Sequence, residues 1–92
     1  MSSICNFKVP NGKLLRVAVE FEGDAIRELK ISGDFFLYPE TGIELLEKAA
    51  KGKKLSELES AFENTLKKNK LLPLGFDAAS LAQAIKIAKG VP

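Results

Sequence analysis

The spacing of apolar residues changes once along the chain, and that change restricts the folds open to it. Up to about residue 35, apolar and polar residues alternate, which is typical of β-strands with one buried face. From about residue 41 onward, apolar residues recur every three or four positions, which is typical of amphipathic helices. Strands followed by helices predict an α+β fold, a three-stranded antiparallel meander with about three helices packed on one face.

Short turns at Pro10-Asn11-Gly12 and Gly23-Asp24 separate the three predicted strands, because these residues tolerate left-handed backbone. One face of the sheet is expected to be apolar and buried, and its residues are Cys5, Phe7, Val9, Leu15, Val17, Val19, Phe21, Leu29, Ile31, Gly33 and Phe35. The other face is expected to be either solvated or in contact with a partner, and it carries Arg16, Ala18, Glu20, Glu28, Lys30 and Ser32.

Two helices are predicted in the middle of the chain, each opened by a capping box. Thr41 with Glu44 marks the first start, Ser56 with Glu59 marks the second, and Gly52 separates the helices. The expected apolar stripes are Leu45, Leu46, Ala49 and Ala50 in the first helix, and Leu55, Leu58, Phe62, Thr65 and Leu66 in the second.

A third helix is predicted after residues 71–75, which we interpret as a buried connector because they are apolar and contain Pro73. Asp77 is the expected N-cap, with Phe76 and Leu81 placed as a hydrophobic staple. The apolar stripe and the stop of this helix are Leu81, Ala84, Ile85, Ala88 and Gly90.

Composition predicts one domain over residues 1–92 and gives few candidates for chemistry. The net charge is +2, so no strongly basic surface is expected. Two lysine clusters fall where helices are predicted to end, which favours stabilisation of the helix dipole over phosphate binding. They are Lys48, Lys51, Lys53 and Lys54, then Lys67, Lys68 and Lys70.

Groups able to make or break bonds are scarce in this sequence. Histidine is absent and Cys5 is the single cysteine, so neither neutral-pH acid–base catalysis by histidine nor a clustered Cys/His metal site is expected. No phosphate-binding glycine motif occurs, and the acids of the predicted helices suit a solvated face. We therefore expect that this chain has no catalytic residue and no cofactor or metal site. We expect it to act as a binding module. With no signal peptide or membrane-spanning run, the default location is cytoplasmic.

The turn after the third predicted strand is the best candidate for a contact surface. Gly33, Asp34 and Pro39 interrupt regular pairing. Phe35, Phe36 and Tyr38 alternate about this turn, so regular alternation does not allow all three to point into the same core. One reading is that all three line the core; the other is that at least one contacts a partner.

Residues 7–88 resemble the small accessory domain of lipoate–protein ligases, which in some archaea is a separate short subunit. The resemblance lies above all in Gly33-Asp34-Phe35-Phe36 within 31–36, supported by the segments 8–15, 22–24, 44–47 and 52–55 and by the acid-capped helix at Asp77. It implies a fold like that of the iron–sulfur scaffolds and sulfur acceptors of the SufE and NifU type.

The resemblance also implies a function and a partner. Such subunits form a heterodimer with a catalytic subunit that uses ATP, Mg and lipoate to make lipoyl-adenylate, and then acylates a lysine of a lipoyl-acceptor protein. The catalytic subunit carries its own glycine-rich loop and active lysine, neither of which occurs here, so no catalytic role is assigned to this chain. We expect the partner interface at this turn, with Phe36 and Tyr38 as the contact residues and Gly33 and Asp34 shaping the turn. Lys8 and Arg16 on the strands are weaker candidates.

Three alternatives remain open at the level of sequence. An iron–sulfur or sulfur-transfer scaffold would need reactive thiolates, and only Cys5 is present. A nucleic-acid-binding module would need aromatic residues on the exposed sheet face, where none is predicted, so we expect no nucleic acid and no membrane as partner. The third alternative is a subunit of a related ligase that acts on octanoate or another acyl acid. This sequence does not distinguish it from a lipoate ligase subunit, since the substrate pocket would lie in the other subunit.

Overall fold

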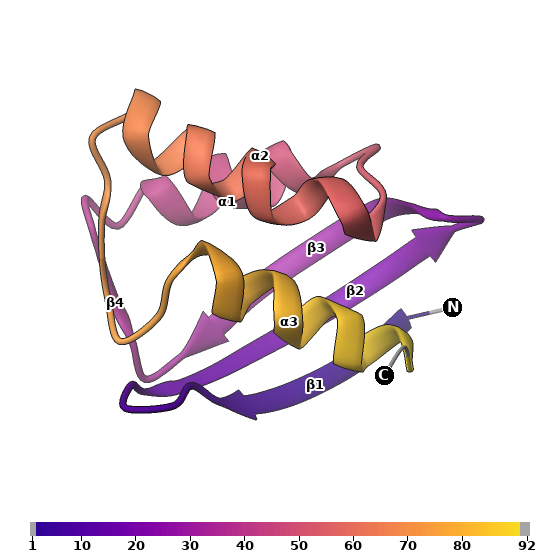
Figure 1. Ribbon diagram of the computed structural model, residues 1–92, viewed down its shortest axis with the longest axis horizontal. Helices are drawn as coiled ribbons and strands as arrows, with labels where there is room; N and C mark the ends of the chain where they lie inside the picture. The colour runs from indigo at the N-terminus through magenta and orange to yellow at the C-terminus, as the bar shows by residue number, and fades with distance from the viewer. Residues whose placement is uncertain (1, 91–92) are drawn as a thin grey trace.

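The protein consists of one three-stranded sheet, a two-stranded ribbon and three helices, as a computed structural model of residues 2–90 shows (Figure 1). The elements in chain order are β1 (Ser2–Lys8), β2 (Leu14–Glu22), β3 (Ala25–Gly33), β4 (Phe36–Tyr38), α1 (Gly42–Ala50), α2 (Leu55–Lys68), β5 (Leu72–Leu74) and α3 (Ala78–Lys89). Strands β1, β2 and β3 are antiparallel neighbours in that order, and the helices lie over one face of their sheet (Figure 1). The predicted α+β meander with three helices is therefore confirmed.

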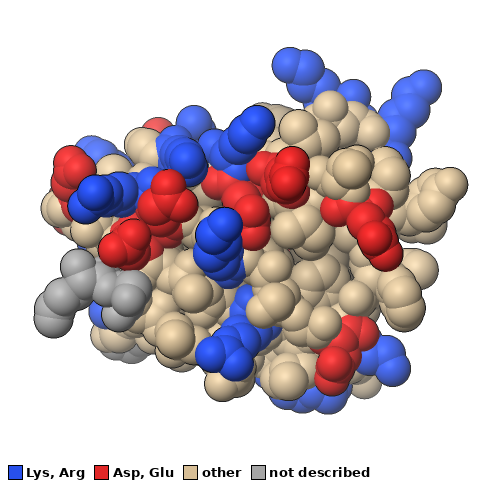
Figure 2. Space-filling view, turned by 180° about the vertical axis from the view of Figure 1, so that it is seen from behind, with Lys and Arg blue, Asp and Glu red and all other residues tan. Residues whose placement is uncertain are grey.

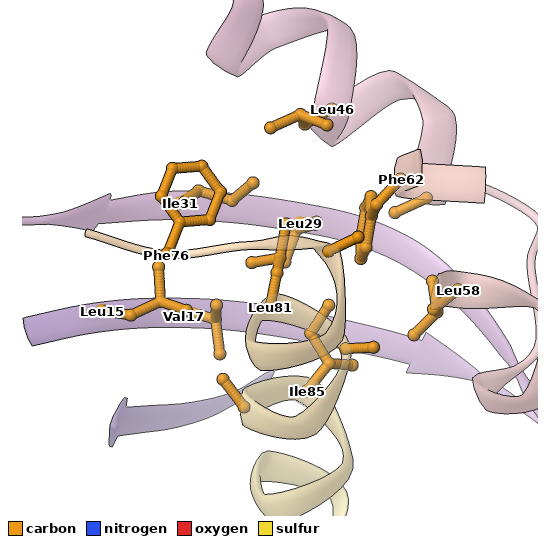
Figure 3. Close-up of a cluster of buried hydrophobic side chains, with 14 of the residues drawn as sticks. Leu15, Val17, Leu29, Ile31, Leu46, Leu58, Phe62, Phe76, Leu81 and Ile85 are labelled. Carbon is orange, nitrogen blue, oxygen red and sulfur yellow. The ribbon is translucent and has the colours of Figure 1, made fainter. Parts of the chain in front are cut away.

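The core lies between the sheet and the helices. Leu15, Val17 and Val19 of β2 are fully buried, as period-two alternation requires for the central strand. Helices α1, α2 and α3 close over them with their own apolar stripes, drawn in Figure 3 as Leu46, Leu58, Phe62, Leu81 and Ile85. The predicted inward face of the sheet, apart from Gly33, and most of the predicted helix stripes are thus confirmed.

A β-bulge in the second hairpin adds a core residue that alternation did not predict. The register between β2 and β3 shifts between Glu20 and Phe21. Because a bulge adds one residue to one strand, the inward face moves from odd to even positions. Ile26 and Leu29 are therefore both buried although they are three residues apart.

Local signals gave the turns and the third helix correctly. Asn11 and Gly23 have left-handed backbone, with φ of 59° and 61°. At the start of α3, the Asp77 carboxylate accepts from the Ser80 N–H at 2.7 Å, and the Asp77 N–H donates to the Ser80 hydroxyl at 2.9 Å. Gly90 ends the helix with φ of 85°. The predicted cap and stop of α3 are confirmed.

The predicted starts of the first two helices are wrong in detail. Thr41 has helical backbone and its side chain makes no capping hydrogen bond. Helix α2 starts one position before Ser56, and the Lys54 N–H donates to the Glu57 carboxylate at 2.9 Å. Both errors arise because a Ser/Thr-x-x-Glu pattern does not fix where the backbone leaves its extended conformation.

The buried face of α1 also differs from the apolar stripe that the sequence predicts. Leu45 is 38% exposed, whereas Ile43 packs against the core beside buried Leu46. The inward face of the helix is thus rotated toward Ile43 and Gly42, whose missing side chain leaves room for Leu71.

Residues 71–75 are not a buried connector. Leu71 is buried, but Leu72 and Leu74 are exposed and belong to a short strand, β5, that pairs with β4. Gly33, predicted to face inward, is exposed at the end of β3. No helix within residues 2–90 is long and apolar enough to cross a bilayer.

Candidate partner interface

The β4–β5 ribbon presents four large apolar side chains to solvent on one face. Phe36 pairs with Leu74 and Tyr38 pairs with Leu72, so all four share a face of the antiparallel pair. Their exposed fractions are 67% for Phe36, 73% for Tyr38, 54% for Leu72 and 51% for Leu74. We call these four residues the ribbon patch.

The opposite face of the ribbon anchors it to the core. Leu37, between Phe36 and Tyr38, is only 4% exposed and pairs across the ribbon with Pro73. Figure 1 shows the ribbon at the end of the main sheet, spanning the distance between the sheet and helices α1 and α2. Strand alternation therefore buries one side of the ribbon and forces the other side outward.

Contacts at the base of the ribbon hold it in place. The rings of Phe35, just before β4, and Phe76, just after β5, pack edge to face with centroids 4.7 Å apart. The Gly75 carbonyl accepts from the Lys13 N–H at 2.9 Å. The ribbon is thus fixed to the sheet, which favours an ordered surface over a mobile loop.

Gly33 and Asp34 form the bend between β3 and β4. Gly33 has φ of 147°, and a Cβ atom at this position would collide with the carbonyl oxygen of Leu14. The Asp34 N–H donates to that same carbonyl at 3.0 Å. The bend therefore needs glycine and directs the chain into β4, which is the shaping role that the sequence predicted for these two residues.

A groove of about 370 Å³ adjoins the ribbon patch. Its walls come from the end of β3, from β4 and from the start of α1, and its lining residues are Ile31, Ser32, Gly33, Phe35, Phe36, Leu37, Glu40 and Ile43. Phe36 belongs to both the groove and the ribbon patch, so the two form one continuous surface.

Lys8 and Arg16, the two weaker candidates, lie on the main sheet and outside the ribbon patch. Arg16 is exposed on the open sheet face, between Asn6 and Ser32 of the neighbouring strands. The Lys8 ammonium donates to the carbonyls of Val9 at 3.1 Å and Gly12 at 2.6 Å. It therefore closes the first turn, a role that the sequence did not suggest.

The structure also shows whether acidic residues and Cys5 are placed for metal binding or nucleophilic chemistry. Within residues 2–90, no three His, Cys, Asp or Glu side chains lie close enough together to hold a metal ion. Cys5 is buried, and burial raises the pKa of its thiol. A raised pKa disfavours the thiolate, which is the nucleophilic form.

Comparisons with known proteins agree on one kind of relative. No family model matches the chain. It is 29% identical over 82 residues to a Thermoplasma acidophilum protein described as "Lipoate-protein ligase A subunit 2". That alignment covers 89% of this chain and 85% of the Thermoplasma protein. Its fold matches a chain in the structure of a bi-partite lipoate protein ligase and its E2 lipoyl domain from the same species. The TM-score is 0.80 at 27% identity, over 92% of this chain and 94% of the other.

The resemblance to the accessory subunits of lipoate–protein ligases is confirmed. It rests on sequence and on fold, and it extends over nearly the full length of both proteins.

Sequence reasoning missed two of the four residues of the ribbon patch. The sequence places Leu72 and Leu74 in a buried connector because the segment is apolar and Pro73 argues against a helix. The available signal was the alternation of two leucines about a proline, since proline is tolerated in a short edge strand.

Proposed function

We propose that this chain is the noncatalytic subunit of a two-chain lipoate–protein ligase and that the ribbon patch contacts the catalytic subunit. The patch carries this proposal. Four large apolar side chains, each at least half exposed, lie together on a rigid ribbon at one end of the molecule. Contiguous exposed apolar surface on a small domain is typical of a protein interface.

In this proposal, the catalytic subunit binds ATP, Mg and lipoate, and this chain binds none of them. The lipoate carboxylate attacks the α-phosphorus of ATP and pyrophosphate leaves. A lysine amine of the acceptor protein then attacks the acyl carbon of lipoyl-adenylate, forming an amide and releasing AMP. This reaction needs aligned reactants and exclusion of water from the mixed anhydride. A subunit that binds the closed form of its partner more tightly than the open form favours both.

The size of that preference sets what the interface must supply. Coupling of about 1–3 kcal/mol between two conformations changes an equilibrium roughly 5- to 150-fold. Differential burial of a few apolar side chains is sufficient, at about 1.5–3 kcal/mol for each fully buried one. The ribbon patch is therefore large enough for this task without any reactive group.

Several finer assignments belong to the same proposal. The sheet with helices on one face is compatible with a SufE/NifU-like fold. A cytoplasmic location fits a lipoylation partner. The alternative of a sulfur-transfer scaffold is disfavoured, because the one cysteine is buried with a raised pKa. The acyl acid, lipoate or octanoate, is chosen by the catalytic subunit.

The test compares two double variants in pyrophosphate release from ATP and lipoate by the matching catalytic subunit. Phe36→Ser with Tyr38→Ser removes aromatic area from the ribbon patch. Ile4→Ser with Ile87→Ser is the matched control, because these side chains are exposed and apolar but lie outside it, at 58% and 42%. We expect the wild-type chain and the control to accelerate adenylation, and the ribbon variant to lose that effect.

Two outcomes would contradict the proposal in different ways. If adding the wild-type chain leaves adenylation unchanged, the accessory function is wrong. If the ribbon variant stimulates as well as the control, the function stands and the ribbon patch is not the interface. Thermal unfolding of both variants checks that each remains folded.

A further inference from the structure

The end of α2 lies next to the ribbon patch and carries three exposed lysines. Lys67 and Lys68 form the last turn of the helix, and Lys70 comes two residues before Leu72 of β5. Figure 1 shows this end of α2 above the ribbon, and Figure 2, seen from behind, shows basic side chains projecting at the corresponding corner beside uncharged surface. We call Lys67, Lys68 and Lys70 the basic rim.

The basic rim has no acidic partner among the residues that the structure describes. The ion pairs found among residues 2–90 are Lys51 with Glu28 at 3.3 Å and Lys89 with Asp24 at 3.9 Å. Glu63 precedes Lys67 by one helical turn without forming an ion pair. The three ammonium groups are therefore free to meet an external charge.

Helix-end stabilisation explains Lys67 and Lys68 but not Lys70. Lys70 lies beyond the helix with φ of 53°, a left-handed backbone that favours glycine. Its N–H donates to the Lys67 carbonyl at 3.2 Å, and the Leu71 N–H donates to the Leu66 carbonyl at 2.9 Å. This is the C-terminal motif in which glycine normally occupies the left-handed position. Lys70 is therefore a backbone outlier whose side chain forms no ion pair within residues 2–90.

We propose that the basic rim binds carboxylates of the catalytic subunit that border the surface covering the ribbon patch. This inference rests on the proposed function. It specifies a partner surface that is apolar at its centre and acidic beside the start of β5. Exposed Glu40 follows Tyr38 and therefore lies at the same end of the ribbon as Lys70, whereas exposed Asp34 lies at the other end, before Phe36. The three lysines outnumber the one acid at the rim end, so positive charge is concentrated at one end of the patch and favours one orientation of docking.

The structure offers a matched control at the other end of α2. The other lysine cluster contains Lys51, which is ion-paired and is therefore not changed in the control. Its other members are Lys48, Lys53 and Lys54. The fourteen residues of α2 separate the two ends, a distance of about 21 Å in a helix. The two triple variants Lys67→Gln/Lys68→Gln/Lys70→Gln and Lys48→Gln/Lys53→Gln/Lys54→Gln each remove three positive charges.

The experiment measures association of each variant with the catalytic subunit from about 20 to 300 mM NaCl, a range over which screening of exposed charges becomes strong. We expect the rim variant to associate about tenfold more slowly at low salt, with a flatter salt dependence. The control should keep the wild-type slope. At high salt all three proteins should bind alike, because the apolar contact remains.

The outcomes separate the two proposals. If the wild-type chain binds the catalytic subunit and both variants keep its salt dependence, the basic rim has no such role. If the wild type does not bind at any salt, the proposed function itself fails. A salt-sensitive mobility shift of a single-stranded oligonucleotide that only the rim variant loses, together with unchanged subunit association, would overturn the inference in favour of nucleic acid.

Discussion

Within residues 2–90, two residues other than glycine adopt left-handed backbone, and the two differ in conformational energy. Asn11 has φ of 59° in the first turn, a conformation that asparagine tolerates. Lys70 has φ of 53° after α2, where its Cβ is crowded by the following carbonyl. The first residue agrees with local preference, whereas the second opposes it. If the basic rim binds the catalytic subunit as proposed, Lys70 is a position where stability and binding favour different residues.

Replacing Lys70 by glycine should stabilise the protein while weakening association with the catalytic subunit. Glycine relieves a left-handed strain of about 1–2 kcal/mol, partly offset by its greater unfolded-state entropy, so we expect a gain of about 0.5–1 kcal/mol. Urea unfolding measures it. Lys68→Gly removes the same charge from helical backbone and should cost about 0.5–1 kcal/mol instead. Equal effects of the two substitutions would contradict this account of the strain.

Gly33 should be irreplaceable for steric reasons. In Gly33→Ala, the new Cβ meets the backbone carbonyl of Leu14, which cannot move without disturbing β2. We expect a loss of about 2 kcal/mol or more in thermal unfolding. Gly23→Ala is the control, since its φ of 61° is also left-handed but its Cβ would point into open space. Its cost should stay near 1 kcal/mol. A smaller loss at Gly33 than at Gly23 would contradict the steric argument.

At the scale of the element, the two faces of the β4–β5 ribbon should respond oppositely to substitution. Leu37→Ala empties a buried site and should cost about 2–5 kcal/mol of unfolding free energy. Leu72→Ala, on the exposed face, loses only a cross-strand contact with Tyr38 and should cost less than about 1 kcal/mol. In the proposed interface, Leu72→Ala should weaken binding to the catalytic subunit although it changes the free energy of unfolding little. Similar stability losses would show that the ribbon is not anchored on one side.

The elements that sequence predicted well are those whose signals are local. Asp77 and Ser80 form a reciprocal cap within one turn of α3, and alternation along β2 fixes which side of a central strand is buried. The ribbon escaped prediction because β4 and β5 are three-residue strands separated by α1 and α2. Such pairing depends on contacts distant in sequence, and no local pattern specifies the partner.

At the scale of the whole molecule, the candidate site was half predictable for the same reason. The sequence singled out Phe36 and Tyr38, because alternating aromatics in a strand cannot share one face with Phe35. Leu72 and Leu74 join them only after the chain has passed through two helices and returned to the end of the sheet (Figure 1). Lys70 gained its significance from a backbone angle that composition does not reveal.

The buried thiol of Cys5 should couple global unfolding to pH. Burial raises the pKa of Cys5 in the folded chain above its unfolded value of about 8.5, because the thiolate is poorly solvated there. Above that pH the unfolded chain releases the thiol proton and the folded chain keeps it, so the free energy of unfolding falls as pH rises. The stabilisation by the protonated thiol is fully present below the pKa of the unfolded chain. It is lost as the pH rises through the pKa of the folded chain. Urea unfolding from about pH 7 to 9.5 should therefore show a steeper loss for wild type than for Cys5→Ala. Parallel curves would mean that the thiol has the same pKa in the folded and unfolded chain, which would contradict this prediction.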